Sequence, residues 1–191
     1  GRGSKLLAKT GITINAVTAS VQAPASADMA TEFEVAWQGP NNKSDYISIA
    51  RPDQGPGQYV NYTYTSKGSP LKVRAPSDPG TYEVRYILGR GSKLLAKTGI
   101  TINAVTARVA CPKTAAVDSA IQVKWQGPGH KGDYICISRP DQKPGRYVNY
   151  QYTGKGNPLT VKAPKAPGAY EIRYILGRGK KMLASVPITI E

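Results

Sequence analysis

The side chains that could do chemistry in this chain are few and scattered. The one histidine, His130, lies in a Gly-rich stretch where the matching position of the other half of the chain is Asn42. A catalytic histidine needs a nucleophile or a carboxylate partner, and no Ser or Cys near it in sequence forms such a pair. The sequence therefore predicts no catalytic residue, and we expect the chain not to be an enzyme.

The carboxylates that occur in both halves of the chain have simpler explanations than catalysis. Asp45 follows a turn, where a carboxylate accepts hydrogen bonds from nearby backbone N–H groups. Glu83 and Arg85 are two residues apart, so in a strand they share a face and predict a surface ion pair or cross-strand pair. The full set is Asp45 and Asp133, Asp53 and Asp141, Glu83 and Glu171.

The two cysteines, Cys111 and Cys136, leave two alternatives open. A structural zinc site needs about four ligands, and two Cys with one His cannot supply them, so we expect no metal. Gly89-Arg90-Gly91-Ser92-Lys93 looks like a phosphate-binding loop but lacks a following helix, so it predicts a hairpin turn and no cofactor. The cysteines are either two buried thiols or one disulfide, the latter in an oxidising compartment.

An internal repeat of 88 residues organises the chain. Residues 20–103 align without a gap on residues 108–191, with 49 identities in 84 positions. Trp37-Gln38-Gly39-Pro40 recurs as Trp125-Gln126-Gly127-Pro128, and all 12 tyrosines fall in matched pairs. A period this long indicates a duplicated domain.

Each repeat has the pattern of short strands. Glu32 to Trp37, Tyr59 to Tyr64 and Thr81 to Leu88 alternate apolar and polar residues, as half-buried strands do. Further strands are expected at Asp45–Ala50, Leu71–Arg74, Lys93–Ile102 and, to open the repeat, near Ala16–Val21. Seven short strands with frequent Gly and Pro turns predict an all-β fold of two tandem immunoglobulin-like β-sandwiches. The predicted repeats are residues 16–103 and 104–191.

Residues 1–19 are identical to residues 89–107. We interpret residues 1–15 as the final strand of a preceding repeat, the alternative being a duplication introduced by cloning. The link between the repeats, Asn103 to Arg108, has no Gly or Pro. This link predicts a stiff end-to-end arrangement.

Two groups of residues carry a resemblance to known proteins. Pro79-Gly80-Thr81-Tyr82 and Pro167-Gly168-Ala169-Tyr170 resemble the tyrosine corner of immunoglobulin-like domains, although Val84 and Ile172 stand where the sixth-strand cysteine would be. The whole repeat resembles small sandwich repeats of bacterial surface or envelope proteins, some of which carry a von Willebrand A domain. The resemblance implies an extracytoplasmic location.

One set of polar aromatic and basic residues suggests a binding surface, because Tyr and Arg dominate binding hot spots. Its members are Arg51, Tyr59, Tyr62, Arg139, Lys143, Arg146, Tyr147 and Tyr150. Tyr62 and Tyr64 share a strand face, so the alternative is that these rings are half-buried core.

The function that these observations favour is a non-catalytic spacer or interaction repeat that binds a protein or a glycan, or neighbouring repeats of a longer chain. No run of 18 apolar residues occurs, so no transmembrane segment is predicted. The alternative is an anionic polymer, such as an acidic glycan, a nucleic acid or an anionic lipid surface. It rests on the second repeat, where residues 108–191 hold 14 Lys and Arg against 5 Asp and Glu.

Overall fold

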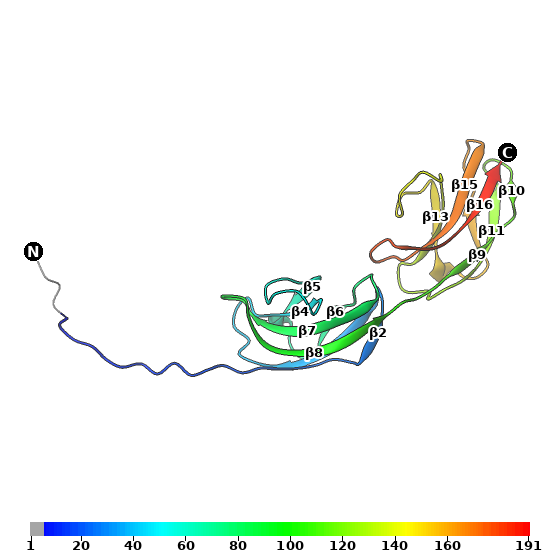
Figure 1. Cartoon of the computed structure of the whole chain (residues 1–191). Helices are drawn as coiled ribbons and strands as arrows, with labels where there is room; N and C mark the ends of the chain where they lie inside the picture. The colour runs from blue at the N-terminus through cyan, green and yellow to red at the C-terminus, as the bar shows by residue number, and fades with distance from the viewer. Residues whose placement is uncertain (1–5) are drawn as a thin grey trace, which may run out of the picture.

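The computed structural model describes residues 6–191 and shows two β-sandwiches in tandem (Figure 1). The strands of the first repeat are β1 (Ser20–Gln22), β2 (Ser26–Asp28), β3 (Glu32–Gln38), β4 (Tyr46–Ala50), β5 (Asn61–Tyr64), β6 (Leu71–Arg74), β7 (Gly80–Leu88) and β8 (Lys93–Asn103). Those of the second are β9 (Arg108–Ala110), β10 (Thr114–Ala115), β11 (Ala120–Gln126), β12 (Tyr134–Ser138), β13 (Asn149–Tyr152), β14 (Leu159–Lys162), β15 (Gly168–Ile175) and β16 (Met182–Ile190). A short 3-10 turn follows β5 and β13, at Thr65–Lys67 and Thr153–Lys155.

Each sandwich packs a small sheet on a large one. In the first repeat the small sheet has the order β1-β3-β6 and the large sheet β2-β8-β7-β4-β5. The sequence predicts one opening strand, but the chain divides it: β1 pairs antiparallel with β3, and β2 pairs parallel with β8 in the other sheet. Pro24 lies at the crossing and has no N–H to continue the ladder. Each repeat therefore has eight strands where seven are expected.

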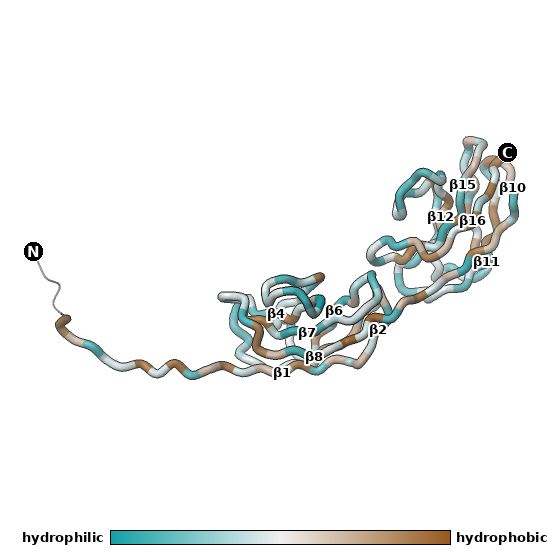
Figure 2. The backbone as a smooth tube through the Cα atoms, in the orientation of Figure 1, coloured by the Kyte–Doolittle hydropathy of each residue, from teal (hydrophilic) through white to brown (hydrophobic). Residues whose placement is uncertain are grey.

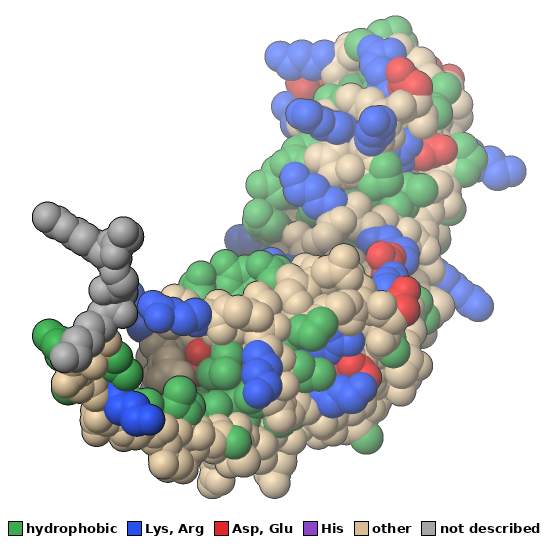
Figure 3. All heavy atoms as spheres, turned by 60° about the vertical axis from the view of Figure 1, so that its left-hand side comes forward, with side chains coloured by type: hydrophobic (Ala, Val, Ile, Leu, Met, Phe, Trp, Pro, Cys, Tyr) green, Lys and Arg blue, Asp and Glu red, His purple; other side chains and the backbone are tan. Residues whose placement is uncertain are grey.

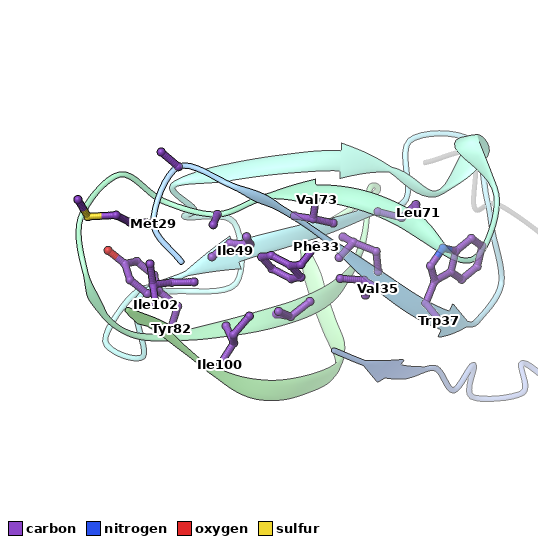
Figure 4. Packing of buried hydrophobic residues seen from close by; sticks show 14 of the residues in the cluster. Met29, Phe33, Val35, Trp37, Ile49, Leu71, Val73, Tyr82, Ile100 and Ile102 are labelled. Carbon is purple, nitrogen blue, oxygen red and sulfur yellow. The ribbon is translucent and has the colours of Figure 1, made fainter. Parts of the chain in front are cut away.

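The cores lie between the two sheets of each sandwich. Phe33, Val35 and Trp37 are buried while their neighbours along β3 are exposed, which confirms the predicted alternation (Figure 4). Across the core, the Trp37 ring lies 5.6 Å from the ring of Tyr86 on β7. The second repeat keeps this pair as Trp125 and Tyr174, 5.8 Å apart.

The tyrosine corner that the sequence predicts is present in both repeats. The hydroxyl of Tyr82 donates to the backbone oxygen of Asp78 at 3.0 Å, and that of Tyr170 donates to Ala166 at 3.0 Å. Together with two sheets of this strand order, the corner confirms two tandem immunoglobulin-like sandwiches.

A buried carboxylate ties the end of each sandwich together. Asp45 accepts hydrogen bonds from the N–H of Asn42 (2.9 Å), the N–H of Gly89 (3.0 Å) and the hydroxyl of Tyr86 (3.0 Å). Burial, together with the bond to Asp45, raises the pKa of Tyr86. A side chain at Gly89 would collide with the backbone oxygen of Ser44, so the approach of this hairpin to the turn requires glycine. The predicted turn-capping role of Asp45 is confirmed, and it extends to the β7–β8 hairpin.

Asp133 repeats this arrangement in the second sandwich. It accepts from the N–H groups of His130 and Gly177, both at 2.9 Å, and from the hydroxyl of Tyr174 at 2.8 Å. His130 therefore takes part in the turn through its backbone, in the place that Asn42 occupies in the first repeat.

Residues 6–19 have no regular secondary structure, and most of this segment extends away from the first sandwich (Figure 1). Figure 2 shows apolar and polar residues alternating along this tail. Its large apolar side chains, Leu6, Leu7, Ile12 and Ile14, are 75–87% exposed. The same residues in their second occurrence form β8, which pairs with β7 and β2. Residues 1–5, the start of the predicted leftover strand, lie outside the described part of the chain.

Candidate interaction surface

A buried arginine holds a long loop over the outer face of the large sheet. Loop 51–60 joins β4 to β5 and folds back over β7, where the Arg85 side chain is only 3% exposed. Arg85 donates from Nη1 to the backbone oxygen of Gln54 (2.8 Å) and from Nη2 to that of Arg51 (3.0 Å). It also pairs with Glu83, its Nε lying 2.8 Å from Oε2. The predicted pair is present, but the loop covers it, so it is not a surface pair.

The same anchor recurs in the second repeat. Arg173 donates to Glu171 at 2.7 Å and to the backbone oxygens of Gln142 (2.6 Å) and Arg139 (3.0 Å). In the first repeat, burial of the Glu83 carboxyl alone would raise its pKa, but hydrogen bonds from Lys97 and Arg85 outweigh burial and lower the pKa. Both loops are thus fixed by the arginine of an ion pair, which in the first repeat is joined by Lys97.

Four tyrosines form a continuous row where each anchored loop meets the edge strand. We call this group the tyrosine row; its members are Tyr46, Tyr59, Tyr62 and Tyr64 in the first repeat, and Tyr134, Tyr147, Tyr150 and Tyr152 in the second. Neighbouring ring centroids lie 4.9–5.7 Å apart in the first row and 4.7–5.6 Å apart in the second. These spacings suit tilted and edge-to-face packing of aromatic rings.

Within each row, one ring is buried and the other three are exposed. Tyr46 and Tyr134 lie beneath the others, and burial raises the pKa of Tyr134 to about 12. The remaining six rings are 39–47% exposed. Tyr62 and Tyr64 lie opposite Ser48 and Tyr46 on the outer face of the sheet. The interpretation of these rings as half-buried core is therefore wrong, because the core is on the other face.

The arginines predicted to join the tyrosines are placed differently. The Arg51 guanidinium lies over the Tyr82 ring, 5.3 Å from its centroid, and Arg139 lies over Tyr170 at 5.5 Å. Both are cation–π contacts at the tyrosine corner. The cause is register: Ala50 pairs with Glu83, so the next residue emerges beside Tyr82.

The other predicted basic residues lie in the second loop beside its tyrosine row. Lys143 and Arg146 are exposed on loop 139–148 next to Tyr147. Sequence reasoning missed Lys180, whose Cδ lies close enough to Gly145 to touch any side chain placed there. The three matching positions of the first repeat are Gly55, Gln58 and Ser92. The repeat alignment contains a signal for this basic cluster, because three uncharged residues of the first repeat are replaced by cations in the second.

The two cysteines are free thiols. Cys136 alternates with inward-facing residues of β12 and packs with Tyr134 and Ile175 on the outer side of the large sheet. Cys111 packs against the inner core of the same repeat. Because the sheet separates the two side chains, the disulfide alternative is not formed. Burial raises the pKa of both thiols.

Among residues 6–191, no three His, Cys, Asp or Glu side chains gather closely enough to hold a metal ion. The described part of the chain also has no helix long and apolar enough to cross a membrane.

Comparison with solved structures gives similarities of low sequence identity and low TM-score. No protein family profile matches it, and no curated protein matches it in sequence. A marsupial T cell receptor is 13% identical, with a TM-score of 0.34, over 94% of this chain and 73% of the receptor chain. The Yersinia pseudotuberculosis adhesin InvE is 14% identical, with a TM-score of 0.33, over 92% of this chain and 58% of the adhesin. A glycosyl hydrolase family 2 member from Bacteroides cellulosilyticus is 11% identical, with a TM-score of 0.27, over 93% of this chain and 29% of the hydrolase.

Proposed function

We propose that this chain is a non-catalytic interaction module whose two repeats present their tyrosine rows to a protein or glycan partner. The observation that carries the proposal is the exposure of the same three rings in both repeats, on a loop and an edge strand that a buried arginine fixes. Tyrosine combines a large apolar face with a hydroxyl and loses little conformational entropy on binding. A fixed row of such rings is a pre-organised contact surface.

A hollow beside the first tyrosine row offers space for part of a bound partner. This hollow of ≈ 370 Å³ lies beside Tyr62, and its other lining residues are Glu32, Asn61, Thr63, Lys67, Lys72 and Arg74. Its polar lining offers hydrogen-bond donors next to an aromatic face, the combination that a sugar ring or a peptide backbone uses. An extracytoplasmic position, which the sequence resemblance implies, suits a module that holds such surfaces at a set spacing.

The tyrosine rows are tested by removing their outer rings. Changing Tyr62, Tyr64, Tyr150 and Tyr152 together to Ser is expected to lower the affinity of ligands selected by the wild-type chain at least tenfold, because hot-spot aromatics carry about 2 kcal/mol or more each. The ligands would be selected from an array of neutral hexasaccharides and from a library of twelve-residue phage-displayed peptides, and affinities measured by calorimetry.

A matched control is available on the opposite side of each sandwich. Glu34→Ala and Gln122→Ala alter exposed positions of the small sheets, and they should leave the selected ligands bound. Ligands that bind the Ser variant as tightly as the wild type, or no selected ligand from either source, would refute the tyrosine rows as the contact surface.

A second candidate function is supported by the charge difference between the repeats. The second repeat places Lys143, Arg146 and Lys180 around its row, where the first has neutral residues. Figure 3 shows Lys and Arg side chains (blue) over the second repeat, in the upper part of the view. An anionic stretch of glycan, nucleic acid or lipid would meet three cations here, with Asp141 the one carboxylate on the same loop.

The prediction for this candidate is a change in salt dependence. The variant Lys143→Gln, Arg146→Gln, Lys180→Ser gives the second loop the neutral character of the first. With single-stranded DNA as the probe, removing three phosphate contacts should reduce the slope of log K against log salt by about 2. Fluorescence anisotropy at several salt concentrations measures this slope, with heparin and anionic vesicles compared in the same way. An unchanged slope with all three probes rules out the cluster as an anion site.

A further inference from the structure

The two repeats meet through the β15–β16 hairpin of the second repeat and one end of the first repeat. We call this end, which carries Glu32 and Asp78, the acidic end. The β15–β16 hairpin reaches toward the end of the first sandwich (Figure 1). Leu176 from this hairpin is fully buried and belongs to the core cluster of the first repeat. Arg178 Nη1 lies 2.6 Å from Glu32 Oε1, and Lys181 Nζ lies 3.1 Å from Asp78 Oδ1. Both repeats therefore contribute to one apolar and ionic junction.

The close contact at the junction has consequences for the residues on both sides of it. Bonding to Arg178 lowers the pKa of the Glu32 carboxyl. A side chain at Gly179 would collide with the Ser77 hydroxyl. The link between the repeats is held at both ends, because Val105 packs against the first core and Ala107 against the second. The junction is thus a defined interface and not a free hinge.

The first repeat carries the same docking residues at its own upstream end. Its β7–β8 hairpin has Leu88, Arg90 and Lys93 at the positions of Leu176, Arg178 and Lys181. Leu88 is only half-buried, and Arg90 and Lys93 are exposed. Neither of these two cations forms an ion pair with any residue between 6 and 191.

The tail also has an apolar residue that is exposed where its copy at the junction is packed. Ala19, the copy of Ala107, packs against the first core, as Ala107 packs against the second. Val17, the copy of Val105, is 47% exposed. At the junction between the two repeats, Val105 packs on the core of the first repeat, which precedes it. The upstream end of the first repeat therefore carries the residues of the hairpin side of the junction, with no partner for them among residues 6–191.

The downstream end of the second repeat lacks the acceptor half. Ala120, Lys165 and Ala166 stand where the first repeat has Glu32, Ser77 and Asp78. Val117 is 41% exposed, whereas Met29 at the matching position is 2% exposed. At these positions an arginine and a lysine would meet Lys165 and no carboxylate, and the nearby Asp118 is already paired with Lys162. This end therefore lacks the two acceptor carboxylates of the first repeat.

We propose that the β7–β8 hairpin of the first repeat, with Val17, is a docking surface for the acidic end of another repeat of the same kind, one with carboxylates at the positions of Glu32 and Asp78. Stacking of these repeats then has one direction, set by a basic hairpin on one repeat and an acidic end on the next. A second copy of the present chain is a poor occupant, because its own second repeat already covers its acidic end. The inference concerns the spacing of repeats and is independent of the tyrosine rows.

The duplication within the chain provides the test. Because residues 1–19 repeat residues 89–107, joining a copy of residues 20–88 before residue 1 creates a complete additional repeat. In that three-repeat chain Leu88 should become shielded, as Leu176 already is. The measurement is the relaxation of assigned leucine methyl signals caused by a neutral gadolinium chelate in solution. We expect the effect on Leu88 to fall at least threefold, toward the value for Leu176 in the same molecule.

The matched control gives the added repeat the acceptor residues of the second repeat. With Glu32→Ala and Asp78→Ala in the added copy, Leu88 should stay as accessible as in the 191-residue chain. Equal shielding with and without these carboxylates, or an unshielded Leu88 in the three-repeat chain, overturns the proposal. Shielding of Leu88 that appears in the 191-residue chain as its concentration rises also overturns it, in favour of a second copy.

A further variant keeps the test valid even where the added repeat fails to fold. In the 191-residue chain, Glu32→Lys with Asp78→Lys should expose Leu176 to the chelate at least threefold more than in the wild type. A Leu176 that remains shielded shows that the carboxylates do not control docking, and the proposal then fails.

Discussion

Replacing Arg173 with alanine is expected to destabilise the second repeat by about 3 kcal/mol or more. The side chain is 3% exposed and donates to Glu171 and to backbone oxygens of Gln142 and Arg139. Its removal leaves a partly buried carboxylate without its cation and loop carbonyl groups without donors, and breaking such a pair costs about 3–5 kcal/mol. Urea unfolding followed by the fluorescence of Trp125, in a Trp37→Phe background, measures the loss.

The same variant should also release the loop and disturb the second tyrosine row. Tyr147 lies on that loop, and its ring packs 4.7 Å from Tyr150. Arg173→Lys is the matched control, since it keeps the charge and loses the forked geometry, and we expect it to restore part of the stability but not the full loop order. A loss below 1 kcal/mol for the alanine variant would show that solvent replaces the arginine and that the loop does not depend on it.

Replacing Asp45 with alanine is the second change for which we expect a large effect, a loss of about 3 kcal/mol from the first repeat. Asp45 is 1% exposed and accepts from the N–H groups of Asn42 and Gly89 and from the hydroxyl of Tyr86. Without it, the buried Tyr86 hydroxyl and two partly buried N–H groups lose their partner, and each hydrogen bond to a charged group contributes about 1.5–3 kcal/mol. Thermal and urea unfolding of the variant measure the loss.

Two further substitutions separate the hydrogen-bond network from general effects of charge. Asp45→Asn retains an accepting oxygen and should cost less than the alanine change. Asp53→Ala removes an exposed carboxylate from the loop, and it should change the stability by no more than about 0.5 kcal/mol. Equal losses for Asp45→Ala and Asp53→Ala would contradict the network.

Local rules in the sequence were sufficient for much of the fold. Alternation of apolar residues identified β3 and β7, and the Pro-Gly-x-Tyr motif identified a tyrosine corner that the structure confirms through the Tyr82 hydroxyl. Asp45 was correctly interpreted as a turn cap. These features depend on neighbours in sequence, so a single copy of the repeat reveals them.

The features that sequence reasoning missed depend on contacts between distant segments. The chain changes sheets at Pro24, which no alternation of residues signals. Arg85 is buried because a loop some 30 residues away folds over it, and an Arg in a strand with Glu two residues before it also fits an exposed pair. Arg51 was assigned to the tyrosine surface, yet its side chain turns to the Tyr82 ring because of the strand register.

The exposed tail has a consequence for how the chain folds, because residues 6–15 and the matching part of β8 are the same strand present twice. Because the two segments have the same sequence, the entropy of closing the chain decides which of them pairs with β7. The native pairing closes a four-residue turn between Leu88 and Lys93, whereas the tail would close a loop roughly fifteen times longer, a difference of about 2.5 kcal/mol in favour of β8. β8 therefore pairs with β7 because it is closer along the chain, and not because its sequence differs from that of the tail. A change that weakens the β7–β8 turn would give the tail access to that place in the sheet and exchange one identical strand for the other.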